Sequence, residues 1–194
     1  MKWENLLTTQ TQIPRESNHS KFDDYPISDI EIDYEQIISS SAFRRLQDKT
    51  QVFPLDQSDF VRTRLTHSME VSSVARQLGI MILKGETSYS KDLFKGEDER
   101  IVERIPSVLA CAGLLHDLGN PPFGHFGEVV IGDWFEKELG KNSFNYDGKP
   151  IREILNDQMQ NDLKHFEGNA QAIRILTKSH SDGNNMNLSY SILN

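Results

Sequence analysis

The stretch GLLHDLGNPPFGHFGE, residues 113–128, contains the end of one apolar segment, then glycines and prolines that interrupt a helix, and then the start of another segment. His116 and Asp117 stand at the end of the apolar segment, directly before the Gly/Pro break. A buried carboxylate without a partner is very costly, and imidazole and carboxylate together suit a divalent transition metal. Adjacent helical residues point about 100° apart, so both reach one ion only where the helix end is shaped for it, as at such a break. The pair therefore predicts a metal site.

His125 and Glu128 follow three residues apart, a spacing that places two side chains on one helix face. A carboxylate beside His125 raises the basicity of the imidazole and makes it a general base or acid near neutral pH. The alternative is that Glu128 only interacts with the positive end of its own helix dipole. Further upstream, His67 can supply a third metal ligand or be a core histidine with a satisfied hydrogen bond. The combination of all these residues favours the metal site.

The apolar residues around this stretch recur every three or four positions, as in an amphipathic helix. No segment shows a convincing strand-like alternation of apolar and polar residues, so we predict an all-α fold. A long helix is expected over residues 64–84, stopped by Gly85. Its inward face, which His67 shares, is expected to consist of apolar residues three or four apart: Val71, Val74, Leu78 and Met81.

Other helices are indicated by apolar spacing together with proline or glycine at their ends. The polar segment 141–149 is expected to be a turn between two of them. In the helix at 106–118, the apolar stripe is expected to include Ala112. The expected ranges are 30–47 (weak), 106–118, 126–139, 150–163 and 167–178.

Composition narrows the class of protein. The chain has 194 residues, enough for one sizeable domain, and no stretch approaches the roughly 18 apolar residues of a membrane helix. The N-terminus lacks the pattern of a secretory signal. Cys111 is the only cysteine, so no internal disulfide can form; it is expected to pack in its helix, and the cytoplasm is the expected compartment.

A formal net charge of −8 argues against a protein that coats nucleic acid. Four arginines nevertheless fall within a short, otherwise acidic part of the chain. They form an anion site if the fold brings them together, and are scattered surface residues if it does not. They are Arg44, Arg45, Arg62 and Arg64.

Four blocks of sequence resemble, in order and spacing, the dGTPase branch of the HD phosphohydrolase superfamily. The resemblance covers residues 39–176 and implies an HD-domain helical bundle. It divides the chain into an arm and first helix (1–38), a metal- and nucleotide-binding core (39–178) and an incomplete continuation (179–194). The blocks are FRRLQDKTQVFPL (43–55), VRTRLTHSMEV (61–71), GLLHDLGNPPFGHFGE (113–128) and HFEGNAQAIRIL (165–176).

The resemblance implies that His67, His116 and Asp117 bind a divalent ion, Mn or Mg. In the family a fourth ligand, an aspartate, comes from a later helix. Asp182 does not match it, so the bundle is expected to be truncated before the last metal-ligand helix. Some relatives have histidine where Asn120 stands here, and asparagine is similar to the dGTPase-type enzymes.

The same resemblance implies the reaction. A deoxynucleoside triphosphate, with dGTP preferred, is cleaved to a deoxynucleoside and tripolyphosphate. His125 and Glu128 match the catalytic pair. The family also suggests a homo-oligomer, often a hexamer, a response to single-stranded DNA in some members, and no membrane partner. The residues matched to substrate binding are Arg64 (phosphate), Gln51 (nucleoside), Asn169 (pocket lining) and Arg45 in the FRRLQ motif.

Two other functions share these features. Another HD phosphohydrolase, acting on a different nucleotide, would share the metal ligands but not the FRRLQ and FEGNAQ blocks. A non-catalytic subunit would bind a triphosphate without turnover, and the missing fourth ligand motivates that reading. The products of the reaction distinguish the first alternative from a dGTPase-type enzyme. The presence or absence of turnover distinguishes the second.

Overall fold

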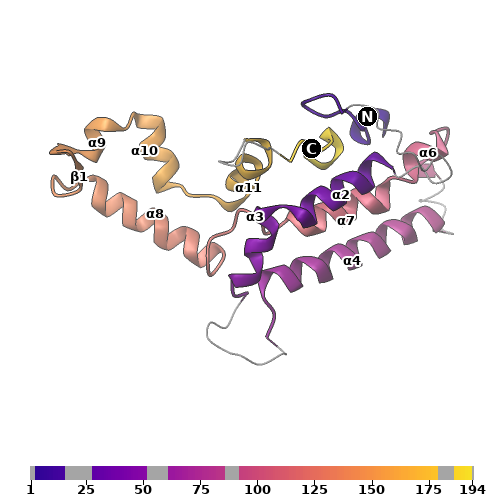
Figure 1. Ribbon diagram of the computed structural model, residues 1–194, viewed down its shortest axis with the longest axis horizontal. Coiled ribbons are helices and arrows are strands. Elements are labelled where there is room, and N and C mark those ends of the chain that lie inside the picture. Colours follow the sequence, from indigo (N-terminus) through magenta and orange to yellow (C-terminus); the bar gives the residue numbers. More distant parts are fainter. Residues whose placement is uncertain (1–2, 16–27, 52–60, 86–91, 179–185, 194) are drawn as a thin grey trace.

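The computed structural model describes residues 3–15, 28–51, 61–85, 92–178 and 186–193 (Figure 1). Within these ranges the regular structure is helical apart from one two-stranded hairpin, which confirms the all-α prediction. In the same ranges, no helix is both long and apolar enough to cross a membrane. The elements are α1 (Trp3–Leu6), α2 (Asp29–Ser39), α3 (Ser41–Arg44), the 3₁₀ helix η1 (Arg45–Asp48), α4 (Arg64–Lys84), α6 (Glu99–Val102), α7 (Ile105–Leu115), α8 (His125–Leu139), β1 (Asn145–Tyr146), β2 (Lys149–Pro150), α9 (Ile151–Ile154), α10 (Asp157–Lys164), α11 (Gly168–Thr177) and α12 (Tyr190–Leu193).

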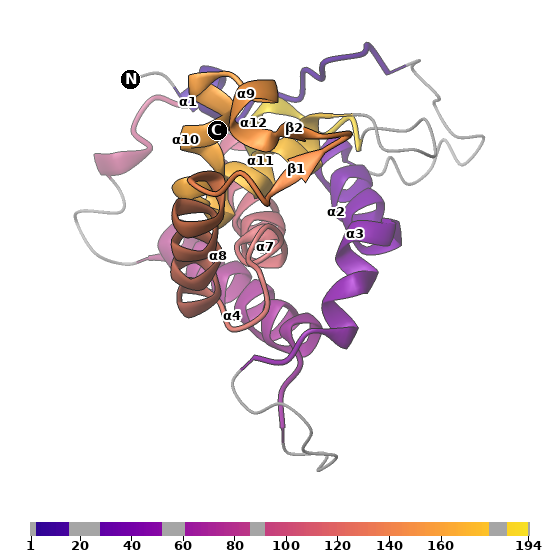
Figure 2. The ribbon, with the colours of Figure 1, turned by 90° about the vertical axis from the view of Figure 1, so that its left-hand side faces the viewer.

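Helix α7 lies at the centre of the bundle, with α2, α4 and α11 around it (Figure 2). Its mean hydropathy is high, and Cys111 is fully buried, which confirms its expected packing role. Ala112 is exposed, so its expected place in the buried stripe was wrong. The main core includes buried residues of α2, η1, α7, the turn after α7, α11 and the segment before α12, namely Ile30, Ile37, Leu46, Cys111, Leu114, Leu118, Leu176 and Leu188.

The inward face of α4 differs from the expected one. Val74, Leu78 and Met81 are largely exposed, Met81 at 67%. Small or polar residues four or seven apart are buried instead, and two of them, Ser72 and Gly79, lie where the backbones of α4 and α7 approach each other closely. A Cβ on Gly113 would lie 2.6 Å from the Cα of Ser72. The buried residues of α4 are Arg64, Ser68, Ser72 and Gly79.

The close crossing of α4 and α7 makes Gly113 a sensitive position. We expect Gly113→Ala to destabilise the protein by about 1–3 kcal/mol, because the added methyl group must push the two helices apart. Ala112→Ser, on the exposed side of the same helix, should stay within about 0.5 kcal/mol. Urea unfolding of both variants measures the difference. Equal stability of the two variants would show that the crossing tolerates a methyl group.

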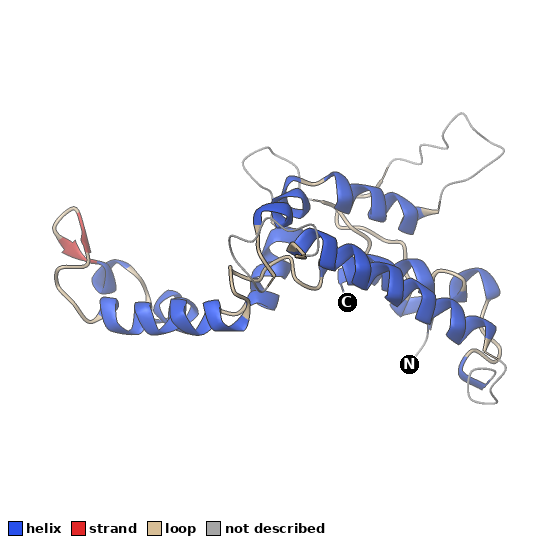
Figure 3. Cartoon of the chain, turned by 90° about the horizontal axis from the view of Figure 1, so that it is seen from below, coloured by secondary structure: helices blue, strands red, loops and turns tan. Residues whose placement is uncertain are grey.

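The segment from α8 to α10 forms an arm that extends away from the bundle (Figures 1 and 3). At its far end the predicted polar turn is a hairpin, because Asp147 (φ 51°) and Gly148 (φ 75°) both have positive φ. Two such residues form the tight turn that matches the twist of paired strands. The single helix expected over 150–163 is broken after α9, where Asn156 caps α10 by accepting from the Met159 N–H.

Both terminal regions of the described chain are fixed to α2 through Asp33, which is fully buried. Its carboxylate accepts from the guanidinium of Arg15 and, at 3.2 Å, from the N–H of Ser189. Ser191 in turn donates to the carbonyl of Thr8 at 2.6 Å. A buried carboxylate needs such partners, so this network joins residues far apart in sequence into the bundle.

Candidate metal centre

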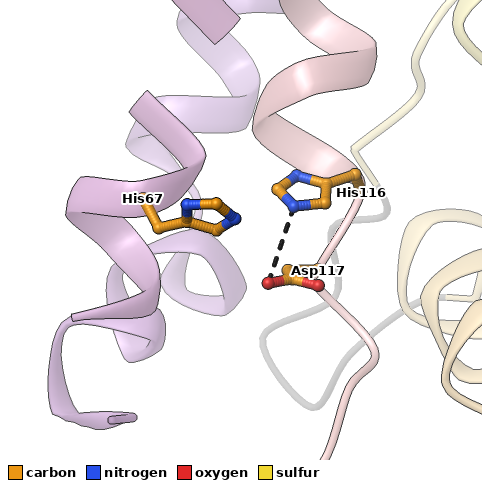
Figure 4. Close-up of side chains that lie close together, drawn as sticks. All are labelled: His67, His116 and Asp117. Carbon is orange, nitrogen blue, oxygen red and sulfur yellow. Dashed lines mark ion pairs between the residues drawn. The ribbon is translucent and has the colours of Figure 1, made fainter. Parts of the chain in front are cut away.

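The three predicted metal ligands come together between α4 and α7. His67 lies in the first turn of α4, and His116 and Asp117 directly follow α7 (Figure 4). Each offers a ligand atom, and these atoms all lie within 4.8 Å of one another. The two imidazole rings stand 5.2 Å apart between centroids, edge to face. Asp182 lies outside the described residues.

The hydrogen bond of His116 fixes which ring nitrogen is free to bind a metal. Its Nδ1 lies 2.8 Å from the carbonyl oxygen of Gly113. A carbonyl only accepts, so Nδ1 carries the proton and Nε2 keeps its lone pair. Nε2 faces the Oδ2 atom of Asp117 at 3.6 Å, the pair joined by a dashed line in Figure 4. One oriented imidazole, a second imidazole and a carboxylate fit a divalent cation.

Asp117 is buried, and both of its oxygens have partners. Oδ2 pairs with Nη1 of Arg64 at 2.8 Å, and Oδ1 accepts from Nδ2 of Asn120 at 2.6 Å. Gln51 Nε2 lies 3.5 Å from Oδ2. Among the described residues, Nε of Arg64 and Oε1 of Gln51 are buried without a hydrogen-bond partner. Buried polar atoms are rarely left so, and this bonding capacity beside the three ligands fits a site for a polar ligand.

Positive charge gathers on one side of this centre. Lys49 donates to the carbonyl oxygen of Asn120 at 3.3 Å. Burial lowers the pKa of Lys49, and the nearby guanidiniums of Arg64 and Arg45 lower it further. Lys49 was not among the residues predicted for the site, although it lies in the FRRLQDKTQ block. The cluster thus contains two of the four arginines and this lysine.

The other two arginines contribute less to it. Arg62 forms an exposed ion pair with Glu70 at 2.7 Å, and Arg44 is an exposed residue in the last turn of α3. The assignment of Arg64 to a substrate phosphate, like those of Arg45 and Gln51, stays a prediction.

His125 and Glu128 form the predicted pair at the start of α8. Nδ1 of His125 lies 2.7 Å from Oε2 of Glu128, and the imidazole is 86% exposed. Gly124, with φ 57°, precedes the helix in a backbone conformation that glycine adopts readily. The other oxygen of Glu128 accepts from the N–H of Gly168 at 2.8 Å. Glu128 therefore does more than interact with its own helix dipole.

The carboxylate beside it should shift the titration of His125. The hydrogen bond and the charge of Glu128 raise the pKa of His125 above its ordinary value. The proton on His125 is therefore retained to higher pH, and the charged pair is lost as pH rises through that raised pKa. We expect Glu128→Gln to bring the pKa back toward about 6.5. An NMR titration of the histidine Cε1 protons measures it.

Glu138→Gln removes the same charge at the far end of α8 and is the matched control. Its His125 titration should equal that of the unmodified protein. If Glu128→Gln leaves the pKa of His125 unchanged, the contact between the two side chains does not exist in solution.

Asn169 is exposed, and its side chain donates to Oε1 of Glu167 at 2.8 Å. Glu167 caps α11, because its carboxylate also accepts from the N–H groups of Asn169 and Ala170. The role of Asn169 in the pocket stays a prediction. Within this block, Gly168 contacts the pair of His125 and Glu128 through its N–H, and the sequence pattern did not single it out.

Comparisons with known proteins identify the family of the chain. The family model described as HD domain matches residues 64–192. A deoxyguanosinetriphosphate triphosphohydrolase-like protein from Listeria monocytogenes is 48% identical over 196 residues, covering 100% of this chain and 41% of the relative. Deoxyguanosinetriphosphate triphosphohydrolase of Yersinia enterocolitica is 42% identical over 171 residues, covering 79% of this chain and 34% of the relative.

A third relative, the deoxyguanosinetriphosphate triphosphohydrolase of Yersinia pestis, is 40% identical over 183 residues, covering 85% of this chain and 36% of the relative. The chain thus spans about two fifths, or less, of the length of these relatives. The family model covers well over half of the chain, including all three candidate ligands and the pair of His125 and Glu128. The chain belongs to the HD domain family.

Proposed function

We propose that this protein hydrolyses deoxynucleoside triphosphates, with dGTP preferred, to a deoxynucleoside and tripolyphosphate in a reaction that depends on Mn or Mg. The observation that carries the proposal is the cluster of His67, His116 and Asp117, whose ligand atoms lie within 4.8 Å of one another. The names of the relatives support the choice of substrate. Lys49, Arg45 and Arg64 add the positive charge that a triphosphate requires.

The chemistry divides among groups at the site. His67, His116 and Asp117 would hold a divalent ion, which would act as a Lewis acid toward water and the phosphate. Arg64 keeps Asp117 in place and is the guanidinium we assign to the phosphate oxygens. The bond that breaks joins the 5′-oxygen to the α-phosphorus.

His125 is the residue that moves a proton. The attacking water must lose a proton, and the leaving 5′-oxygen must gain one. His125 can do either, because an imidazole both accepts and donates a proton at its free ring nitrogen. Glu128 holds the imidazole through Nδ1, which leaves Nε2 as the nitrogen that exchanges the proton.

A product assay tests the proposal. The protein, expressed to its natural stop codon, is incubated with dGTP and Mn²⁺, and the products are separated by chromatography. We expect deoxyguanosine and intact tripolyphosphate, after which the other deoxynucleoside triphosphates can be ranked. Diphosphate or single phosphate as the product would instead identify another HD phosphohydrolase. Bound nucleotide without turnover would identify a sensing subunit.

A further inference from the structure

The two oxygens of Glu128 have different partners on different elements. Oε2 holds His125 within α8, and Oε1 accepts from the backbone N–H of Gly168 at the start of α11, 2.8 Å away. A carboxylate bound at one oxygen only can rotate about its last torsion, whereas one bound at both oxygens cannot. Gly168 therefore restricts the orientation that Glu128 gives to His125.

The place of Gly168 leaves no room for a side chain. A Cβ there would lie 2.7 Å from Oε1 of Glu128 and 2.1 Å from Oδ1 of Asn120. On the other side of the contact, a Cβ on Gly119 would lie 2.0 Å from the carbonyl oxygen of Gly168. Gly119 and Gly168 thus allow the start of α11 to pack closely against the loop at residues 119–120.

Asn120 continues the contact to the metal ligands. Its Nδ2 donates to Oδ1 of Asp117 at 2.6 Å, while its Oδ1 is the atom that lies next to Gly168. Asp117 stands just after α7 of the bundle, whereas α8 leads into the arm (Figure 1). The path from Asp117 through Asn120 and Gly168 to Glu128 joins the two parts.

We propose that Gly168 and Asn120 are positioning residues that hold the Glu128–His125 pair in register with the metal ligand Asp117. Gly168 fixes the carboxylate of Glu128, and Asn120 fixes the carboxylate of Asp117. The packing of Gly168 against Asn120 fixes the position of the Glu128 carboxylate relative to the Asp117 carboxylate. The role of this arrangement in catalysis rests on the proposed function. The arrangement itself can be tested without turnover, through the pKa of His125 and the affinity for Mn²⁺.

The first test is Gly168→Ala. Alanine favours a helix more than glycine does, so any harm comes from the close contacts. We expect the pKa of His125, followed by NMR, to fall toward about 6.5 as Glu128 is displaced, and kcat for dGTP to fall about 100-fold, the scale of a 1 Å misplacement. Binding of Mn²⁺ should weaken as well, because the added methyl group also displaces Asn120, which donates to the carboxylate of Asp117.

Gly140→Ala is the matched control, because Gly140 directly follows α8 with φ −70°, and among the described residues a Cβ there would contact the Lys137 carbonyl oxygen alone, at 3.8 Å. It should leave the pKa of His125 and kcat unchanged. An unchanged His125 pKa in a folded Gly168→Ala protein would overturn the proposal, whether or not kcat falls.

Asn120→Ala removes atoms and creates no clash, so it keeps the proposal testable if Gly168→Ala does not fold. We expect it to weaken Mn²⁺ binding, measured by calorimetry, by about 10- to 100-fold, as for other residues that orient a metal ligand. Unchanged Mn²⁺ affinity would overturn the role of Asn120. If the unmodified protein hydrolyses no triphosphate, the proposed function fails, but the pKa and Mn²⁺ measurements still decide the positioning proposal.

Discussion

Replacing His125 with alanine is expected to lower kcat for dGTP by about 100- to 10 000-fold, the usual contribution of a positioned general acid or base. The imidazole is exposed and lies outside the metal ligand cluster, so its loss should not disturb the fold or the bound ion. KM should change little, because the imidazole moves a proton and is not assigned to substrate binding. A loss in kcat without a change in KM would therefore assign His125 to the chemical step and not to substrate binding.

The measurement is steady-state kinetics together with the metal content of the purified variant. His165→Ala is the control, since His165 is another exposed histidine, directly after α10, whose Nδ1 lies 3.0 Å from the carbonyl oxygen of Asn161. It should retain full activity. Loss of the metal from His125→Ala would place His125 in the ligand set and contradict its role as a proton carrier.

Local signals in the sequence were enough to locate the elements that carry the site. Helix α4 spans Arg64–Lys84, as expected, because Thr63 caps its start and Gly85 follows its end. The break after His116 and Asp117 was visible from Pro121 and Pro122. Such signals depend on neighbouring residues alone, so the sequence contains them in full.

The buried face of α4 was not predictable from hydropathy. Ser68, Ser72 and Gly79 are buried although they are neither strongly apolar nor charged, and the α7 backbone passes close to Ser72 and Gly79. An apolar spacing at Val74, Leu78 and Met81 pointed to the wrong side of the helix. Close backbone contact between helices selects small residues, and a scale that rewards large apolar residues does not detect it.

Contacts between blocks that are far apart in the sequence could not be predicted either. The FEGNAQ block was matched to the pocket, but nothing in it indicated that Gly168 would donate to Glu128, 40 residues earlier. Lys49 joins the positive cluster only because η1 brings it to Asn120, 71 residues later. The residue types of a site can be recognised in a sequence, whereas the partners that orient them depend on tertiary packing.

His116→Ala is expected to abolish stoichiometric metal binding and, with it, turnover. His116 offers Nε2 from an imidazole that Gly113 already orients, so alanine removes a preorganised ligand. It is a cleaner probe than Asp117, whose side chain is 11% exposed and pairs with the buried guanidinium of Arg64. Removing that carboxylate would leave a buried charge unpaired and cost about 3–5 kcal/mol, which would confuse unfolding with metal loss.

Thermal unfolding with and without Mn²⁺ makes the test independent of activity. A ligand at 100 times its Kd stabilises the folded state by about 2.7 kcal/mol. Mn²⁺ should therefore raise the Tm of the unmodified protein and leave that of His116→Ala unchanged, while the two metal-free Tm values stay close, because the His116 side chain is 34% exposed. Full metal content in His116→Ala, with an Mn²⁺-dependent rise in Tm, would show that the ion binds elsewhere and that His67, His116 and Asp117 do not form the metal centre.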